Sequence, residues 1–92
     1  MIDSNRKLRR KQDVIEADID DDKVMMDAAS GKYFGLDPIA CRIWELMDED
    51  TTIIDIANKL VGEYNVEKQV CIKETSTFVE SLMKNNLAKY SE

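Results

Sequence analysis

Residues 24–38 decide the fold, and they are V-M-M-D-A-A-S-G-K-Y-F-G-L-D-P. Two short apolar runs in this stretch are separated by Ser30-Gly31, and glycine adopts turn conformations at little cost. The second run is rich in aromatic residues, which favour strands. Asp37 followed by Pro38 is typical of a helix start, because the carboxylate accepts backbone N–H groups and proline needs no donor there. The stretch therefore predicts two strands and a turn that lead directly into a helix.

A further strand is predicted upstream of this stretch. Ile15, Ala17 and Ile19 alternate with acidic residues, and this period of two places apolar side chains on one face of a strand. The three aspartates at 20–22 favour a turn. An EF-hand needs spaced ligands, a glycine and a distal glutamate, so these aspartates indicate a solvated turn rather than a calcium site. Three consecutive strands with tight turns predict an antiparallel meander whose last strand, 32–36, is an edge.

Helices are predicted downstream of the meander. Apolar residues recur at helical spacing in three segments, which span about 38–47, 52–62 and 67–85. Thr52 opens the second segment with a capping-box-like arrangement, and Gly62 or Asn65 ends it. Asn86 is the expected left-handed cap of the third segment, followed by a short extended exit at 87–90. The pattern predicts an α+β domain in which a three-stranded antiparallel sheet precedes three helices.

The third predicted helix carries two apolar stripes. The expected core seam consists of Cys71, Thr75, Phe78 and Leu82. The second stripe lies about 80–100° away and consists of Ile72, Ser76, Val79 and Met83. One stripe is enough to dock a helix, so the second either packs on another side of the core or forms one wall of a groove. A groove opposite the edge strand would suit an extended peptide, because the strand supplies backbone hydrogen bonds and the groove selects side chains.

Charge is distributed unevenly along the 92 residues, which hold 13 Lys and Arg, 19 Asp and Glu and no histidine, for a net charge of -6. Residues 1–11 contain five bases and one acid, so the remainder is strongly acidic. We expect residues 1–11 to form a flexible basic arm and residues 12–92 to form the domain. A nucleic-acid tail is the alternative for the arm, but the acidic body repels phosphate.

The composition excludes several kinds of chemistry. Without histidine there is no imidazole base, no histidine metal ligand and no triad built on histidine. Cys41 and Cys71 lie far apart with no CxxC motif, so two reduced, buried thiols are expected and a disulfide between their helices is the alternative. No apolar run approaches the ~20 residues of a membrane span, and no signal peptide is recognisable. We expect no enzyme activity, no metal and no cofactor.

Four segments occur in an order that is typical of one protein family. They are V-M-M-D at 24–27, S-G-K-Y-F-G-L at 30–36, I-W-E-L at 43–46 and E-Y-N-V at 63–66. Together they resemble the PqqD-like family, the RiPP precursor peptide recognition elements, which bind leader peptides of ribosomally made, modified peptides. The resemblance covers about residues 13–90. It is strongest to the small stand-alone version found beside lasso-peptide proteases, although the cofactor-pathway version has the same layout.

The resemblance implies a winged-helix-like fold in which a leader peptide adds antiparallel to the third strand and lies against the third helix. It implies strand-side contacts at Lys32, Tyr33, Phe34, Gly35 and Leu36. The expected helix-side contacts come from periodicity alone and are Ile72, Ser76, Val79 and Met83. Tyr33 and Phe34 point to opposite faces of a strand, and the sequence leaves open which of them faces the peptide. Trp44 is expected to anchor the core.

The function implied by the resemblance is that of a non-catalytic peptide chaperone in the cytoplasm. It would capture a precursor peptide by its leader and deliver it to a leader-cleaving cysteine protease or another modifying enzyme of lasso-peptide-like biosynthesis. An exposed edge strand can also pair with its own copy, so a homodimer is an alternative assembly. The alternative function is a winged-helix nucleic-acid-binding regulator. The third helix balances its lysines with glutamates, which disfavours a nucleic-acid-reading face, and no membrane partner is expected.

Overall fold

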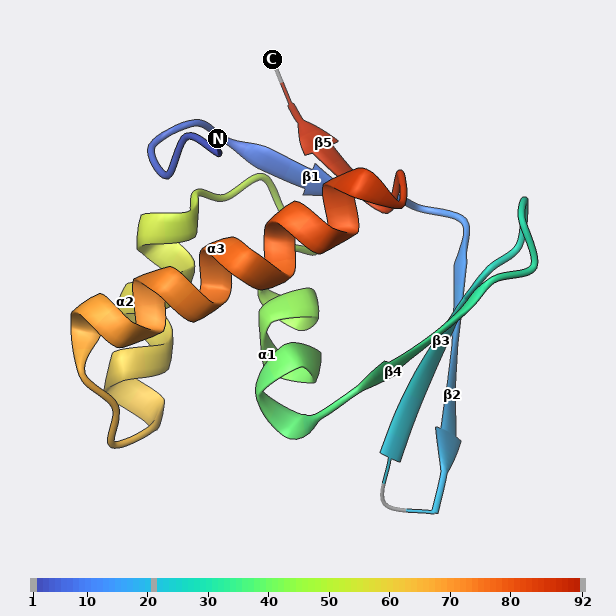
Figure 1. The fold of residues 1–92 in the computed structure, drawn as a ribbon, viewed down its shortest axis with the longest axis horizontal. Helices are drawn as coiled ribbons and strands as arrows, with labels where there is room; N and C mark the ends of the chain where they lie inside the picture. Colours follow the sequence, from blue (N-terminus) through green and yellow to red (C-terminus); the bar gives the residue numbers. More distant parts are fainter. Residues whose placement is uncertain (1, 21, 92) are drawn as a thin grey trace.

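The computed structural model describes residues 2–20 and 22–91. The elements are β1 Leu8–Arg10, β2 Val14–Ile19, β3 Asp22–Asp27, β4 Tyr33–Leu36, α1 Pro38–Leu46, α2 Ile53–Glu63, α3 Lys68–Lys84 and β5 Ala88–Tyr90. Strands β2, β3 and β4 form an antiparallel sheet in that order, and β1 pairs with β5 in a second, smaller sheet. The predicted α+β order, a three-stranded meander followed by three helices, is confirmed (Figure 1).

The local signals in the sequence act where they were expected. Gly31 has a φ of 73° in the turn before β4, and Asn86 has a φ of 59° after α3. Asp37 caps α1, because its carboxylate accepts a hydrogen bond from Ala40 N at 2.7 Å. Thr52 caps α2 in the same way. These caps satisfy N–H groups that a helix start otherwise leaves without partners.

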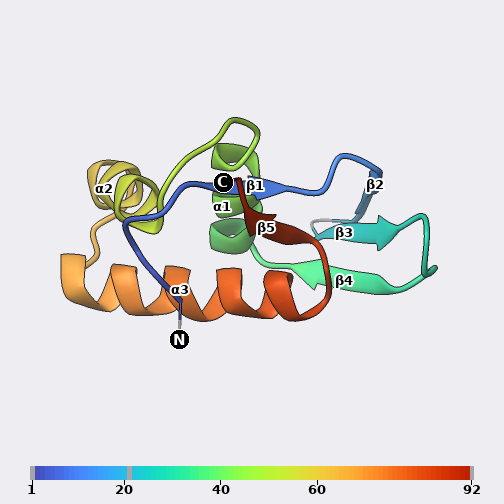
Figure 2. The ribbon, with the colours of Figure 1, turned by 90° about the horizontal axis from the view of Figure 1, so that it is seen from above.

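The core lies where the three helices meet each other and one face of the larger sheet. Its largest fully buried side chains include Trp44, Leu8, Met25, Met47, Ile53 and Ile56. Trp44 is 1% exposed, which confirms it as a core anchor. Figure 2 shows α3 along one side of the molecule, with α1 and α2 behind it and the larger sheet at one end. No helix within residues 2–20 and 22–91 is long and apolar enough to cross a bilayer.

The smaller sheet differs from the expectation of a flexible arm over residues 1–11. Leu8 is fully buried and lies opposite Tyr90 in the β1–β5 register. The backbone of Leu8 also exchanges hydrogen bonds with Thr51, at 2.7 and 3.2 Å. Residues 8–10 form a strand because β5 pairs with them and the core accepts the buried side chain of Leu8.

The bases of this segment have partners within the domain. Arg9 pairs with Asp50 at 3.1 Å, and Arg10 pairs with Asp48 at 2.8 Å. The guanidinium of Arg10 also lies 4.9 Å from the centre of the Trp44 ring, a cation–π contact. Much of the basic charge near the N-terminus is therefore neutralised by acids of the same chain.

Both cysteines are free thiols. Cys71 is buried, whereas Cys41 is only half-buried, so the expectation that both are buried is correct for one of them. Burial of the Cys41 side chain raises the pKa of its thiol, because the charged thiolate is less well solvated there.

Candidate functional site

Strand β4 is an edge of the three-stranded sheet, as predicted. The hydrogen bond from Asp27 N to the carbonyl oxygen of Lys32, 3.0 Å long, shows which backbone groups face β3. In an antiparallel ladder the pairing alternates along the strand, so Phe34 faces β3 in the same way as Lys32. The N–H and C=O groups of Tyr33 and Gly35 consequently point away from β3. They form an open row of donors and acceptors.

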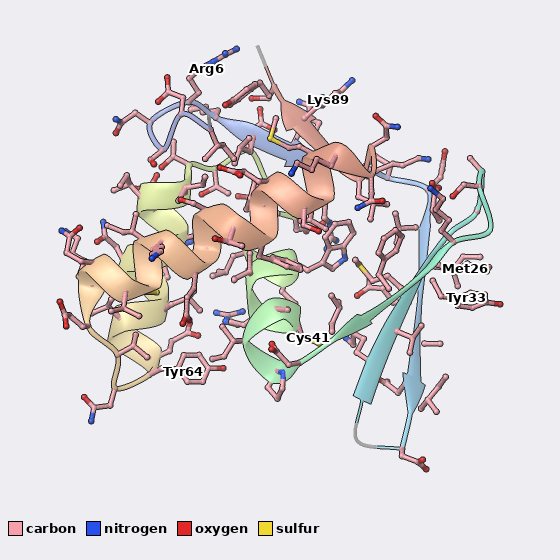
Figure 3. All side chains as sticks on the ribbon, viewed as in Figure 1. Arg6, Met26, Tyr33, Cys41, Tyr64 and Lys89 are labelled. Carbon is pink, nitrogen blue, oxygen red and sulfur yellow. The ribbon has the colours of Figure 1, made fainter. Side chains whose placement is uncertain are left out.

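The side chains of β4 alternate between the two faces of the sheet. Phe34 and Leu36 point toward the helices, where Leu36 is 5% exposed and Phe34 packs against the core. Tyr33 is 73% exposed and lies beside Met26 on the opposite face (Figure 3). Phe34 is therefore the aromatic residue on the helix side of the β4 edge, and Tyr33 is the aromatic residue on the opposite face.

The buried stripe of α3 differs in part from the predicted seam. It consists of Cys71, Thr75, Val79 and Leu82. Val79 is 0% exposed, so it belongs to the core and not to the second stripe, and Phe78 is only half-buried. The exchange of Phe78 for Val79 corresponds to a rotation of the helix about its axis by about 25°, at about 100° per residue. The direction from which the core approaches α3 sets this rotation.

The residues beside this stripe lie on two different flanks of α3. Ile72, Ser76 and Met83 share one flank, and Glu74 and Phe78 share the other, by their positions on the helix. The expected helix-side contacts therefore do not form one surface, because one of them, Val79, is in the core. Only the position of α1 and β4 relative to α3 shows which flank is next to the open edge.

A small cavity identifies that flank. Its volume is about 50 Å³, and its wall consists of Ile39, Ile43, Leu60, Tyr64, Val66, Val70, Cys71, Glu74 and Thr75. The wall includes two residues of α1, so the Glu74 flank of α3 faces α1, which follows β4 directly. In Figure 1, β4 and α1 lie below α3, whereas β1 and β5 lie above it. The structure thus places Ile72, Ser76 and Met83 on the flank away from β4.

An exposed apolar surface borders the small cavity on the α2 side of α1, where Figure 3 shows Tyr64. Tyr64, Val66 and Val70 are large apolar side chains that stay exposed, and all three border the small cavity. Val70 and Phe78 also border a shallow depression of about 560 Å³ on the exposed side of α3. Neither of the two predicted stripes includes this surface, because Val70 falls outside both of them. The motif E-Y-N-V, which contains Tyr64 and Val66, was the signal that could have located it.

Two ion pairs hold the elements that carry this site. Lys11 donates to Asp27 at 2.7 Å, and this hydrogen bond lowers the pKa of the Asp27 carboxyl, with help from Ser30. Arg42 of α1 forms two hydrogen bonds to Glu63 at the end of α2, at 2.8 and 2.7 Å. The Arg42 guanidinium lowers the pKa of Glu63. The first pair fixes the turn before β4, and the second fixes α1 against α2 beside the small cavity.

Comparison with known proteins identifies the family. The chain matches the family described as Coenzyme PQQ synthesis protein D (PqqD) over residues 22–88. The chain belongs to the PqqD family. This membership confirms the resemblance that the four motifs indicate. No curated protein matches the chain in a sequence search.

Two solved structures are similar to this PqqD-family chain over most of its length. The structure of TbiB1 in complex with the TbiA(beta) leader peptide has a TM-score of 0.77 and 29% identity, and the match covers 91% of this chain and 99% of that chain. The structure of lasso peptide synthetase B1 complexed with the leader peptide has a TM-score of 0.76 and 28% identity, with coverage of 89% and 96%. Both similarities support the winged-helix-like architecture.

Proposed function

We propose that this PqqD-family chain is a non-catalytic protein that binds the leader of a ribosomally made precursor peptide. The observation that carries this proposal is the open edge of β4, the strand of the larger sheet that lies nearest to α3 in Figure 2. The two similar proteins, TbiB1 and lasso peptide synthetase B1, were solved with leader peptides. The balanced charges of α3 and the comparisons give no support to the nucleic-acid-binding alternative.

The leader adds antiparallel to β4 as a further strand. The backbone groups of Tyr33 and Gly35 bond the peptide, and residues 32–36 as a whole form the strand side. On the helix side we replace the predicted set by Phe78, because it lies on the flank of α3 that faces α1 and β4. Each backbone hydrogen bond contributes about 0.5–1.5 kcal/mol. A few such bonds and one or two buried side chains suffice for micromolar affinity after the cost of ordering the peptide.

The captured peptide is delivered to a partner enzyme of lasso-peptide-like biosynthesis, a leader-cleaving cysteine protease or another maturation enzyme. Holding the leader keeps the rest of the precursor near that enzyme and so raises its effective concentration. This role requires no catalytic residue and no cofactor in the chain itself. We place it in the cytoplasm, where free thiols such as Cys41 and Cys71 persist.

The test is calorimetric titration with a synthetic leader peptide of the precursor encoded beside this chain. We expect a Kd in the micromolar range or lower. Phe78→Ala should weaken binding at least about tenfold, whereas Met83→Ala, a half-buried residue of the opposite flank, should change it less than about threefold. Trp44 fluorescence verifies that both variants are folded.

Two results would count against the proposal. Absence of leader binding by the folded wild-type chain would refute the function. A loss of affinity in Met83→Ala with none in Phe78→Ala would refute the assigned flank. Sedimentation of the peptide-free chain, with and without leader, shows whether the β4 edge pairs with a second copy instead.

A further inference from the structure

The face of the larger sheet that points away from the helices carries apolar side chains on all three strands. The strand register places on this face Ile15, Ala17, Ile19, Val24, Met26 and Tyr33. Ile15 is 52% exposed, Ile19 is 57% exposed and Tyr33 is 73% exposed. Figure 3 shows Met26 and Tyr33 together on this side of the sheet. We call these six residues the outer sheet face.

The polarity of β2 is the reverse of the usual pattern. An antiparallel sheet with one covered face normally directs apolar residues to the core and polar residues to water. Here Glu16 and Asp18 are on the same face as the core residue Met25, and Lys23 pairs with Glu16 at 3.8 Å. Ile15 and Ile19 point outward instead. A gathered apolar surface on a small domain is typical of a contact site for another molecule.

The net charge of the segment that forms the larger sheet restricts what the other molecule can be. Residues 13–37, which contain the whole sheet, hold eight acids and two bases, and this excess equals the net charge of -6 of the entire chain. The rest of the sequence is therefore neutral on balance. A second copy of this chain, a nucleic acid or an anionic membrane would be repelled by the sheet. A protein with basic residues around an apolar patch would be attracted and steered toward it.

The outer sheet face is also continuous with the peptide site of the proposed function. A peptide added to β4 becomes the next strand of the same sheet, and its alternate side chains lie on the same face as Tyr33. The bound leader would thus enlarge the outer sheet face beyond β4. A protein that docks there would contact the chain and its peptide together.

We propose that the outer sheet face is the docking surface for the enzyme that receives the captured peptide, and that this enzyme contacts it through an apolar patch surrounded by Lys and Arg. The proposal rests on the proposed function for the identity of the partner. It assigns to that partner a surface that is distinct from the β4 edge, where the leader binds. Because the leader extends the surface, the enzyme binds the peptide-loaded chain more tightly than the empty chain.

The test measures binding of the purified leader-processing enzyme encoded beside the precursor to the immobilised chain, with and without saturating leader peptide. The double variant Ile15→Lys/Ile19→Lys removes apolar surface and adds two positive charges on β2, two strands away from the open edge of β4. We expect it to weaken enzyme binding at least about tenfold and to change leader affinity less than about threefold. The wild-type complex should also weaken as NaCl rises from about 50 to about 300 mM.

The matched control is Asn58→Lys/Gln69→Lys, which adds the same charge at exposed positions of α2 and α3. It should leave both affinities within about threefold. Enzyme binding that is absent, or that the sheet-face variant and the control reduce equally, would overturn the proposal. Self-association of the wild-type chain that Ile15→Lys/Ile19→Lys abolishes would assign the face to a second copy and also overturn it.

The separate leader titration keeps the two proposals distinguishable. If the wild-type chain fails to bind leader but the enzyme still binds through Ile15 and Ile19, the proposed function fails and the docking surface stands. If leader binds normally but the enzyme binds Ile15→Lys/Ile19→Lys as tightly as the wild-type chain, the docking-surface proposal fails and the proposed function stands.

Discussion

Lys11 Nζ lies 2.7 Å from Asp27 Oδ1, and this ion pair joins the linker between the two sheets to the end of β3. The backbone of Lys11 also donates to the carbonyl oxygen of Leu87, at 2.8 Å, just before β5. Asp27 accepts two more hydrogen bonds, from Ala29 N and Ser30 Oγ. One buried carboxylate thus fixes the turn before β4 and the position of one sheet relative to the other.

The Lys11–Asp27 pair makes the stability of the fold depend on pH in the acidic range. Its hydrogen bond holds the pKa of Asp27 below the ordinary value of 3.8. A carboxyl with a lowered folded pKa stabilises the fold above its unfolded pKa, and this contribution is lost as pH falls through the folded value. Asp27→Asn should therefore lower the urea midpoint at about pH 7 and have a smaller effect at about pH 2.5. Asp18→Asn, at an exposed position, is the control, and an equal effect of Asp27→Asn at both pH values would contradict the prediction.

Burial of Leu8 makes the N-terminal segment part of the cooperative fold. Leu8→Ala leaves a cavity in the core, and such changes destabilise proteins by about 2–5 kcal/mol. We expect the free energy of unfolding in urea to fall by that amount. Lys7→Ala, at an exposed neighbouring position, should change it by less than about 0.5 kcal/mol. An unchanged midpoint in Leu8→Ala would show that the segment is a frayed arm after all.

The Thr75 hydroxyl is a buried polar group in the core. Among the described residues, Thr75 Oγ1 has no hydrogen-bond partner. An unsatisfied buried polar group costs about 1–3 kcal/mol, and valine has nearly the same shape as threonine. Thr75→Val should therefore raise the free energy of unfolding, by about 1 kcal/mol. Thr75→Ser, which keeps the hydroxyl and loses a methyl group, should lower it, and a destabilised Thr75→Val would instead reveal a partner for the hydroxyl.

Short-range chemistry was sufficient to predict the order of the elements. The caps at Asp37 and Thr52 act on N–H groups three residues away, and Gly31 and Asn86 adopt positive φ angles through local sterics. Such signals depend on neighbours in the sequence. They therefore located the turn before β4 and the helix boundaries, and with them the open edge strand of the site.

Features that depend on distant parts of the chain were predicted less well. The strand at Leu8 needs a partner at Tyr90, and three residues carry no periodicity that would show it. The rotation of α3 that buries Val79 in place of Phe78 depends on where the other helices lie. Alternation in β2 placed Ile15, Ala17 and Ile19 on one face of the strand. Which face of the sheet is covered depends on where the helices pack.

The register of the smaller sheet has a consequence for how this domain can be joined to other chains. Leu8 and Tyr90 are opposite each other in adjacent antiparallel strands, where paired Cα atoms lie about 4.5–5.5 Å apart. Residues 8–90 can therefore be spliced into a surface loop of a host protein with almost no change in the span of that loop. The insertion points lie at the smaller sheet, so a host enzyme could carry the domain as an internal cassette with β4 still accessible.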